Sequence, residues 1–301
     1  MPVQSFFKAL ADETRLRLML ILSRYELSVN ELVNLMGMGQ SRISRHLKIL
    51  ADAGLLVARR DGLWVFYSLP KSSLGERFWQ AILPFLMENP NYINDLALAA
   101  NIVQERALKS RQFFNAVADD WDEMTNKLLG NFDLPAAILQ QISKCRLAAD
   151  LGCGTGHMLG WLLEKADKVI GVDGSPRMLD IARQRFAGKK DQVSLRIGEL
   201  EHLPLADNEV DLVNISMVLH HLEKPALALR EIYRVLAPKG KLVIAELVKH
   251  NNERLRTEYG HRWLGFEQSY LLECLEEFNI ENTERHKLDN GLEVIIISAI
   301  K

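Results

Sequence analysis

A glycine-rich segment, residues 150–156 (DLGCGTG), has the residue types and spacing of a loop that binds a nucleoside. Its three glycines, Gly152, Gly154 and Gly156, let the backbone approach a ligand where a Cβ atom would obstruct it. Dinucleotide-binding loops have the spacing G-x-G-x-x-G, whereas this loop has the spacing G-x-G-x-G. Asp150, two places before the first glycine, can face the ammonium of an amino acid but would be unhelpful near a pyrophosphate. The segment therefore argues against a dinucleotide and for a ligand that carries an amino-acid group.

Two further acidic residues follow the next two predicted strands. Asp173 ends the strand predicted at 168–173, and its carboxylate can accept hydrogen bonds from both hydroxyls of a ribose. Glu199 follows the strand predicted at 193–197 and is a candidate acceptor for the amino group of an adenine. The residues that we expect to bind this ligand are Asp150, Gly152, Gly154, Gly156, Asp173, Gly174, Met178, Glu199 and Leu200.

Short apolar strands alternate with helices through the second half of the chain, which predicts a parallel sheet covered on both faces. The strands are predicted at 147–151, 168–173, 193–197, 210–216 and 241–247. The helices between them are predicted near 156–166, 176–187 and 224–236. Residues 286–288 and 292–299 are predicted to close the sheet as a hairpin across Asp289-Asn290-Gly291.

This arrangement resembles the class I S-adenosylmethionine-dependent methyltransferases, especially those that act on small molecules. Further matching segments are 203–205 (LPL), 211–213 (DLV), 219–222 (LHHL) and 234–240 (RVLAPKG), and 115–122 is similar to a lead-in segment that closes over the ligand. The resemblance covers roughly residues 112–301 and implies a Rossmann-like α/β fold. It also implies that the ligand is S-adenosylmethionine or S-adenosylhomocysteine.

Binding of such a nucleoside does not by itself imply methyl transfer. Methyl transfer needs alignment of the reactants, and an oxygen or carbon acceptor usually needs a general base as well. His220 and His221, at the mouth of the predicted sheet, are the candidates, although either could instead pack against the nucleoside or cap a helix. Glu246 and residues 261–263 could line an acceptor pocket, and 263–266 could equally form a lid or an interdomain contact.

Near the N-terminus, a basic stretch coincides with a helix-turn-helix pattern. Residues 40–60 contain five basic side chains and one acidic side chain. A capping box at Ser28 and Glu31 begins one predicted helix, Gly37 ends it, and a second helix with a basic outer face starts near Gln40. Segments 55–60 and 63–69 then predict a hairpin wing across Asp61-Gly62. We expect the DNA contacts to come from Gln40, Ser41, Arg42, Ser44, Arg45, His46, Lys48, Arg59 and Arg60.

Segments 7–15, 40–47 and 53–56 resemble the ArsR family of winged-helix repressors. The resemblance covers roughly residues 3–90 and implies a homodimer, paired through the first and last helices, on a palindromic double-stranded operator. Many members sense soft metals through thiolate or imidazole ligands. Here residues 28–32 contain no cysteine and residues 72–88 contain no histidine, so we expect no metal.

The whole chain therefore predicts two domains with a helical connection. We place a winged helix-turn-helix at 1–90, a connecting or dimerisation helix at 91–115 and the nucleoside-binding α/β domain at 116–301. The net charge is −2 overall, but nine basic and six acidic residues give residues 1–70 a charge of 9 − 6 = +3. The three cysteines are too few and scattered for a disulfide framework, and neither a secretion signal nor an apolar run of about 20 residues is evident, so we expect a cytoplasmic protein with no membrane partner.

Two functions remain open on these grounds. In the first, the protein is a repressor whose methyltransferase-like domain senses S-adenosylmethionine or S-adenosylhomocysteine, as in the fused ArsR-type regulators that the whole chain resembles. In the second, it is an active methyltransferase of a small molecule with a fused regulatory DNA-binding domain. The absence of an evident metal-sensing site and of a convincing acceptor-activating group favours the first.

Overall fold

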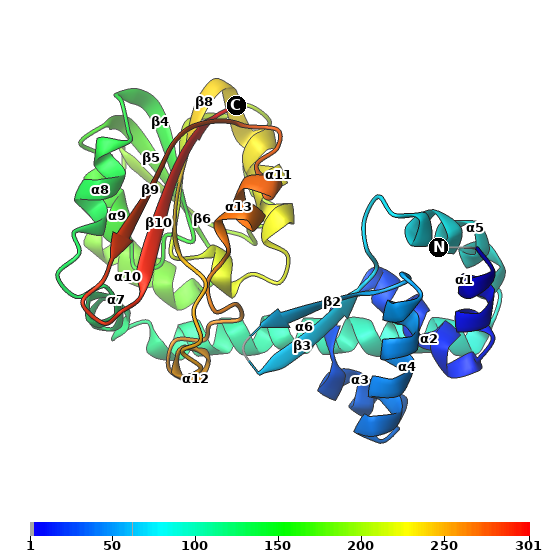
Figure 1. Cartoon of the computed structure of the whole chain (residues 1–301). Helices are drawn as coiled ribbons and strands as arrows, with labels where there is room; N and C mark the ends of the chain where they lie inside the picture. Colours follow the sequence, from blue (N-terminus) through cyan, green and yellow to red (C-terminus); the bar gives the residue numbers. More distant parts are fainter. Residues whose placement is uncertain (1–2, 62) are drawn as a thin grey trace. The chain divides into compact units, whose positions relative to one another are not determined.

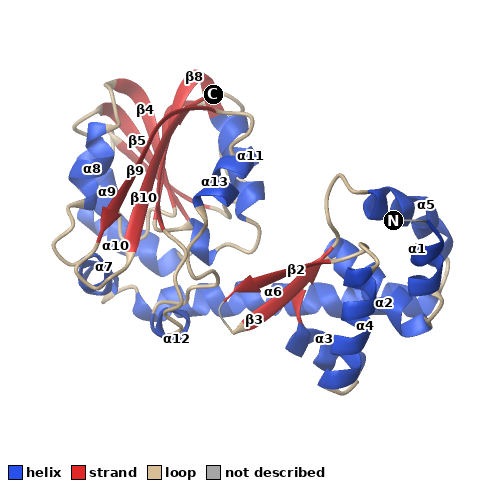
Figure 2. Cartoon of the chain, in the orientation of Figure 1, coloured by secondary structure: helices blue, strands red, loops and turns tan. Residues whose placement is uncertain are grey.

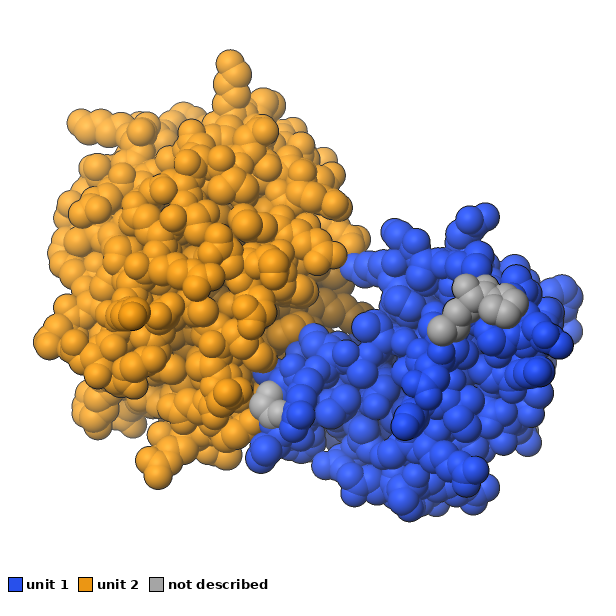
Figure 3. Space-filling view, viewed as in Figure 1, with its two compact units in different colours: residues 1–109 blue, residues 110–301 orange. Residues whose placement is uncertain are grey.

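A computed structural model describes residues 3–61 and 63–301. The chain divides into two compact units, residues 1–109 and 110–301, which are coloured separately in Figure 3. One long helix, α6 (Pro90–Val117), contributes residues to both units. None of the described helices is long and apolar enough to cross a membrane.

The first unit is a helix-turn-helix with a hairpin wing. Its elements are α1 (Val3–Leu10), α2 (Glu13–Arg24), β1 (Leu27–Ser28), α3 (Val29–Met36), α4 (Gln40–Asp52), β2 (Val57–Asp61), β3 (Trp64–Ser68), α5 (Leu74–Leu86) and the first part of α6 (Figures 1 and 2). The sheet has the order β1-β3-β2, so the predicted hairpin is confirmed, although Gly62 of its turn lies outside the described residues.

Local capping explains where these helices begin and end. The Asp12 side chain accepts a hydrogen bond from the Arg15 amide at the start of α2. Ser28 and Glu31 form the predicted capping box at the start of α3, and Gly37 ends that helix in the left-handed conformation. Pro84 lies inside α5, which continues to Leu86. Pro90 begins α6, where the missing amide hydrogen of proline costs nothing.

Apolar side chains of α4 anchor this helix in the unit. Ile43, Leu47 and Leu50 are fully buried, together with Trp79 from α5. The guanidinium of Arg17 on α2 donates two hydrogen bonds, of 2.6 and 2.8 Å, to the buried carboxylate of Asp95 on α6. Burial of one face of α4 leaves its opposite face to solvent.

The second unit is a seven-stranded sheet with helices on both faces (Figures 1 and 2). The strands are β4 (Cys145–Leu151), β5 (Ala166–Asp173), β6 (Val193–Ile197), β7 (Val210–Ser216), β8 (Leu236–Leu247), β9 (Asn279–Lys287) and β10 (Glu293–Ile300). The sheet order is β6-β5-β4-β7-β8-β10-β9, in which the first five strands are parallel and β10 pairs antiparallel with both β8 and β9. This confirms the predicted parallel sheet with a closing hairpin, and β8 begins earlier than the expected residue 241.

Two hydrophobic cores lie on opposite faces of this sheet. One contains side chains from α8 (Leu134–Gln140), α9 (His157–Leu162) and α10 (Pro176–Arg185). The other contains side chains from α11 (Pro225–Val235) and α13 (Gln268–Cys274). The remaining elements of the unit are α7 (Trp121–Leu129), a short 3₁₀ helix η1 (Leu219–His221) and α12 (Arg254–Glu258). Because both faces are covered, functional groups are presented at the ends of the strands.

Candidate functional site

The glycine-rich loop joins β4 to α9 at the carboxyl end of the parallel strands. Gly152, Gly154 and Gly156 have positive φ values of 69°, 52° and 84°. A Cβ atom on Gly152 would lie 2.6 Å from a methyl of Val218, and one on Gly156 would lie 3.0 Å from the ring of Phe186. Backbone conformation and tight packing therefore both require glycine at the two ends of the loop.

The Asp173 carboxylate fixes this loop from the neighbouring strand. One oxygen accepts a 2.8 Å hydrogen bond from the Gly154 amide, and the other accepts a 2.8 Å bond from the Ser175 amide. Burial raises the pKa of Asp173, although these amide donors act in the opposite direction. Each carboxylate oxygen has two lone pairs, so acceptor capacity remains for the hydroxyls of a ligand.

Asp150 at the end of β4 is a second buried carboxylate at the same edge. It accepts a 2.7 Å hydrogen bond from the amide nitrogen of Asn214 on β7. Burial raises the pKa of Asp150 to about 7, and the nearby Asp173 acts in the same direction. A cationic group placed beside Asp150 would favour the ionised carboxylate and so lower its pKa again.

Residues at the end of α6 and the start of α7 cover the glycine-rich loop. The Trp121 ring lies 3.6 Å from the position that a Cβ atom on Gly154 would take. The Asp122 carboxylate accepts a hydrogen bond from the Thr155 hydroxyl and forms a 2.5 Å ion pair with Arg185. On the α10 side, the Ser175 hydroxyl donates a 2.7 Å bond to Asn115. We name residues 115–122 the cover segment.

The other predicted binding residues lie around the same edge with differing exposure. Met178 and Leu200 are buried, and the Met178 sulfur lies 3.9 Å from the Cβ position of Gly154. Gly174 follows β5 directly, beside the Gly198 carbonyl. The exposed carboxylate of Glu199 forms a 3.2 Å ion pair with Arg111, a partner that the sequence did not indicate. To accept a hydrogen bond from an adenine, the Glu199 carboxylate would have to loosen or break its ion pair with Arg111.

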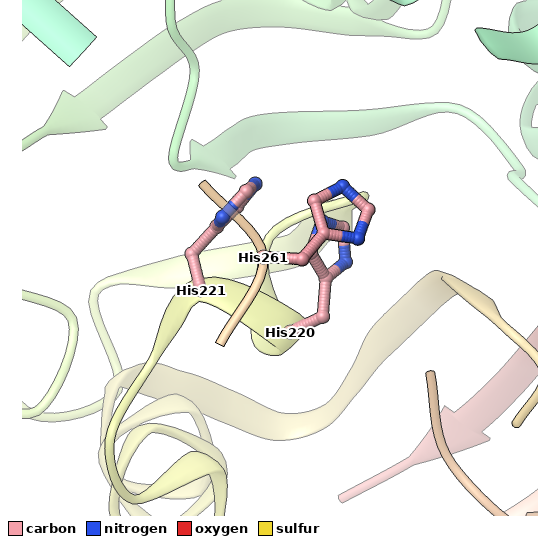
Figure 4. Close-up of side chains that lie close together, drawn as sticks. All are labelled: His220, His221 and His261. Atoms are coloured by element: carbon pink, nitrogen blue, oxygen red, sulfur yellow. The ribbon is translucent and has the colours of Figure 1, made fainter. Parts of the chain in front are cut away.

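A group of histidines lies at the carboxyl ends of β7 and β8 (Figure 4). The His220 ring contacts the rings of His221 and His261 with centroids 4.0 Å apart in each pair. His220 Nδ1 is 2.5 Å from the Glu246 carboxylate, and both side chains are buried. His221 Nδ1 is 3.1 Å from the carbonyl of Gly260. Burial lowers the pKa of His221 and of His261, so both imidazoles are neutral at physiological pH.

In the first unit, the outer face of α4 carries the predicted DNA-binding side chains. Gln40, Ser41, Arg42, Arg45 and Lys48 are exposed, whereas Ser44 and His46 are partly exposed. The Nδ1 atom of His46 lies 3.7 Å from the Asp12 carboxylate. The structure therefore places most of the predicted polar residues on one solvent-facing surface of a helix.

The two wing arginines differ in their surroundings. Arg59 donates two 3.0 Å hydrogen bonds to Glu26, lies 3.6 Å from Asp61 and stacks over the Phe66 ring. Arg60 is exposed on the same strand. Arg59 therefore stabilises the base of the wing, and any DNA contact from it would require these ion pairs to change.

Comparisons with known proteins agree with both halves of this description. Residues 12–57 match the family model of bacterial regulatory proteins of the arsR family, and residues 149–244 match that of a methyltransferase domain. An ArsR-family helix-turn-helix is followed by a methyltransferase domain. The chain is 39% identical over 144 residues, or 44% of its length, to the demethylmenaquinone methyltransferase of Lactiplantibacillus plantarum. It spans 60% of the length of that relative.

Solved structures support the fold of the methyltransferase domain. An S-adenosylmethionine-dependent methyltransferase from Aquifex aeolicus superimposes with a TM-score of 0.50 at 21% identity, covering 62% of this chain and 97% of that one. The cyclase SpnF superimposes with the same TM-score of 0.50 at 22% identity, covering 56% of this chain and 79% of that one. A methyltransferase and a cyclase therefore share this fold, so the fold alone does not decide the activity.

The loop geometry predicts that Gly152→Ala will destabilise the methyltransferase domain. A left-handed backbone costs alanine about 1–2 kcal/mol, and the contact with Val218 adds about 1–3 kcal/mol. We expect the thermal unfolding midpoint of this domain, followed by near-ultraviolet circular dichroism, to fall by roughly 5–15 °C.

Gly188→Ala is the matched control, because a Cβ atom there has no neighbour within 4 Å and no positive φ is required. It should leave the midpoint within about 3 °C of the wild type. Equal midpoints for the two variants would contradict the packing argument.

Proposed function

We propose that this protein is a DNA-binding transcriptional regulator whose methyltransferase domain binds S-adenosylmethionine or S-adenosylhomocysteine as an effector. The observation that carries the proposal is the outer face of α4. Five of its predicted DNA-contacting side chains are exposed, while the opposite face is fully buried. Such a helix can enter the major groove, where side chains near its N-terminus reach base edges and basic groups contact phosphates.

A homodimer on a palindromic operator fits the surface of this unit. Large apolar side chains are exposed on its first and later helices, including Phe7 on α1 at 61% and Phe85 on α5 at 75%. Exposed aromatic side chains of this size are typical of protein–protein contacts. Two recognition helices in a dimer would read two half-sites one helical turn apart.

The nucleoside assignment is supported by two carboxylates at one edge of the sheet. Asp150 suits the ammonium of the amino-acid part of the nucleoside, and Asp173 suits its ribose hydroxyls. The glycine-rich loop lies between them, and the cover segment lies over the loop. Both nucleosides share these groups and differ at sulfur, so these contacts admit either one.

An effector can change DNA affinity only if the two states of the protein bind that effector with different affinities. The cover segment offers such a difference. It continues directly from α6, which also belongs to the DNA-binding unit through the ion pair of Arg106 with Glu31. Binding beneath the cover segment can therefore favour one arrangement of α6.

Methyl transfer to a small molecule is the second candidate function, and the His220–Glu246 pair favours it. A carboxylate that accepts the Nδ1 hydrogen holds the imidazole with Nε2 available as a base. The relative from Lactiplantibacillus plantarum is named as a demethylmenaquinone methyltransferase. An acceptor in this chain would meet His220 at the carboxyl edge of the sheet.

Titration of DNA binding against each nucleoside separates these functions. Fluorescence anisotropy would use full-length protein and a duplex that the wild type selects from a random pool. We expect at least one nucleoside to change the dissociation constant for DNA by about 5- to 150-fold, which is the usual range of allosteric coupling. Formation of S-adenosylhomocysteine with candidate acceptors is measured in parallel. Turnover without any effect on DNA affinity would exclude the effector role.

Arg45→Ala should weaken binding to the selected duplex by roughly 5- to 150-fold, because a base-edge contact contributes about 1–3 kcal/mol. Arg77→Ala on α5 removes the same charge from another exposed helix of the unit and serves as the control. We expect less than about a threefold change for it. A similar loss of affinity in both variants would contradict a base contact from Arg45. If Arg45→Ala changed only the salt dependence of DNA binding, making it flatter, Arg45 would be assigned to phosphate contact.

The raised pKa of Asp150 predicts that nucleoside affinity depends on pH. The bound state needs an ionised carboxylate opposite the ligand ammonium, whereas the free protein binds a proton below pH 7. Isothermal titration calorimetry with S-adenosylhomocysteine should therefore show level affinity just above pH 7 and a loss approaching tenfold per unit below it.

Asp150→Asn should bind more weakly and lose this pH dependence, because it has no carboxylate to titrate. Asp180→Asn, at an exposed position of α10, should retain the wild-type profile. The same pH profile in Asp150→Asn as in the wild type would remove Asp150 from the proposed ammonium site.

A further inference from the structure

Three histidines from two distant parts of the methyltransferase domain converge at the carboxyl edge of its sheet. His220 and His221 belong to η1, and His261 lies in the segment after α12. One ring nitrogen from each of the three lies within 4.8 Å of the others. Figure 4 shows the rings of His220 and His261 close together, with His221 beside them.

Two of these rings have buried nitrogens that the described residues do not satisfy. His221 Nε2 and His261 Nδ1 are inaccessible to solvent and have no hydrogen-bond partner among the described atoms. A buried polar atom without a partner costs about 1–3 kcal/mol. A neutral imidazole has one nitrogen with a free lone pair, so each of these two rings can offer a ligand atom.

The Nδ1 atoms of His220 and His221 have the kind of hydrogen-bond partner that the second ring nitrogen of a metal-binding histidine usually has. His220 Nδ1 lies 2.5 Å from the buried Glu246 carboxylate, and His221 Nδ1 lies 3.1 Å from the Gly260 carbonyl. Metal-ligating histidines almost always donate their second ring hydrogen to a carboxylate or a backbone carbonyl. In both rings this arrangement leaves Nε2 as the atom available to a ligand.

The local charge also suits a cation. Glu246 is fully buried and accepts further hydrogen bonds from the amides of His220, at 3.2 Å, and Leu247, at 2.7 Å. Arg256, which also acts electrostatically on His261, is itself paired with Glu253 at 3.0 Å. A divalent ion coordinated by His220 would therefore lie one imidazole away from a buried carboxylate.

We propose that His220, His221 and His261 form a binding site for a divalent first-row transition metal. Imidazole ligands suit Zn²⁺, Fe²⁺, Ni²⁺ and Cu²⁺, and three histidines leave a fourth position open for water or a substrate atom. Glu246 acts as a positioning residue that orients His220. Tetrahedral coordination at 2.0–2.1 Å needs nitrogens about 3.3 Å apart, so binding draws the three rings together from their present spacing.

This site differs in ligands and location from the soft-metal sites typical of ArsR-family sensors. Those sites required cysteine near residues 28–32 or histidine within 72–88, both in the DNA-binding unit. The inference rests on the arrangement of side chains and does not depend on the proposed effector role.

Metal binding by the full-length protein provides the test. After treatment with a chelator, the protein is titrated with Co²⁺ and then with Zn²⁺. We expect one Co²⁺ per chain, visible absorption typical of tetrahedral coordination, and displacement of Co²⁺ by Zn²⁺. Zn²⁺ should also raise the thermal midpoint of the methyltransferase domain, because a ligand that binds only the folded state stabilises it.

Substitutions assign the binding to these side chains. Glu246→Gln should weaken Zn²⁺ affinity about 10- to 100-fold, as expected for loss of a group that orients a ligand. His221→Gln removes a ligand and should weaken it further, with loss of the Co²⁺ absorption. His202→Gln changes an exposed histidine of the same domain and should bind Zn²⁺ as the wild type does.

Two results would overturn the proposal. The first is a wild-type protein that binds no stoichiometric Co²⁺ or Zn²⁺, which would identify the cluster as a packed group of neutral histidines. The second is equal affinity in wild type and His221→Gln with a folded variant, verified by circular dichroism. Measurement on the wild type decides the question even if a buried substitution prevents folding.

Discussion

The Asp173 carboxylate connects the parts of the methyltransferase domain on which the site depends. Through its bonds to Gly154 and Ser175, it holds the glycine-rich loop and the start of α10 at the end of β5. Parallel pairing of β4 with β5 then brings Asp150 to the same edge, where burial and the nearby Asp173 both raise the pKa of Asp150. A ligand with a cationic group and several hydroxyls can relieve both effects. The two carboxylates are thus placed to favour a ligand that has a positive charge near Asp150 and hydroxyls near Asp173.

Elements with a strong local signal could be predicted from the sequence. The apolar pattern located β6 and β7 at the same residues as the structure, and the Ser28 capping box located the start of α3. A strand end that depends on pairing with a neighbouring strand was predicted less accurately. β8 begins before its predicted start because pairing with β7 continues across a register irregularity that no local periodicity reveals.

The chemistry of the site was only partly predictable for the same reason. Sequence spacing placed Asp150, Asp173 and the glycines at one edge of the sheet, because each lies at or just after the end of a strand that the apolar pattern locates. It singled out the neighbouring pair His220 and His221 and suggested that residues 261–263 line a pocket, but it did not indicate the contact between the His220 and His261 rings. That association depends on backbone hydrogen bonds from Arg262 and Trp263 to the His220 carbonyl, of 3.0 and 2.9 Å, which connect segments about forty residues apart. Likewise, no motif indicates that Glu26 binds Arg59, because their pairing follows from the three-stranded sheet.

Helix α6 gives a physical basis for coupling the two chemistries in this chain. Its earlier part carries Arg106, bound to Glu31 of α3, and its last turns carry Arg111 and Asn115, bound to Glu199 and Ser175. Glu199 and Ser175 belong to the edge where the nucleoside is proposed to bind, and α3 packs against the recognition helix α4. A continuous helix transmits a displacement more directly than a flexible linker does, because its backbone hydrogen bonds resist bending. The ion pair between Arg111 and Glu199 links the last turns of α6 to this edge, so an adenine bound at Glu199, as we propose, would compete with the helix for the same carboxylate.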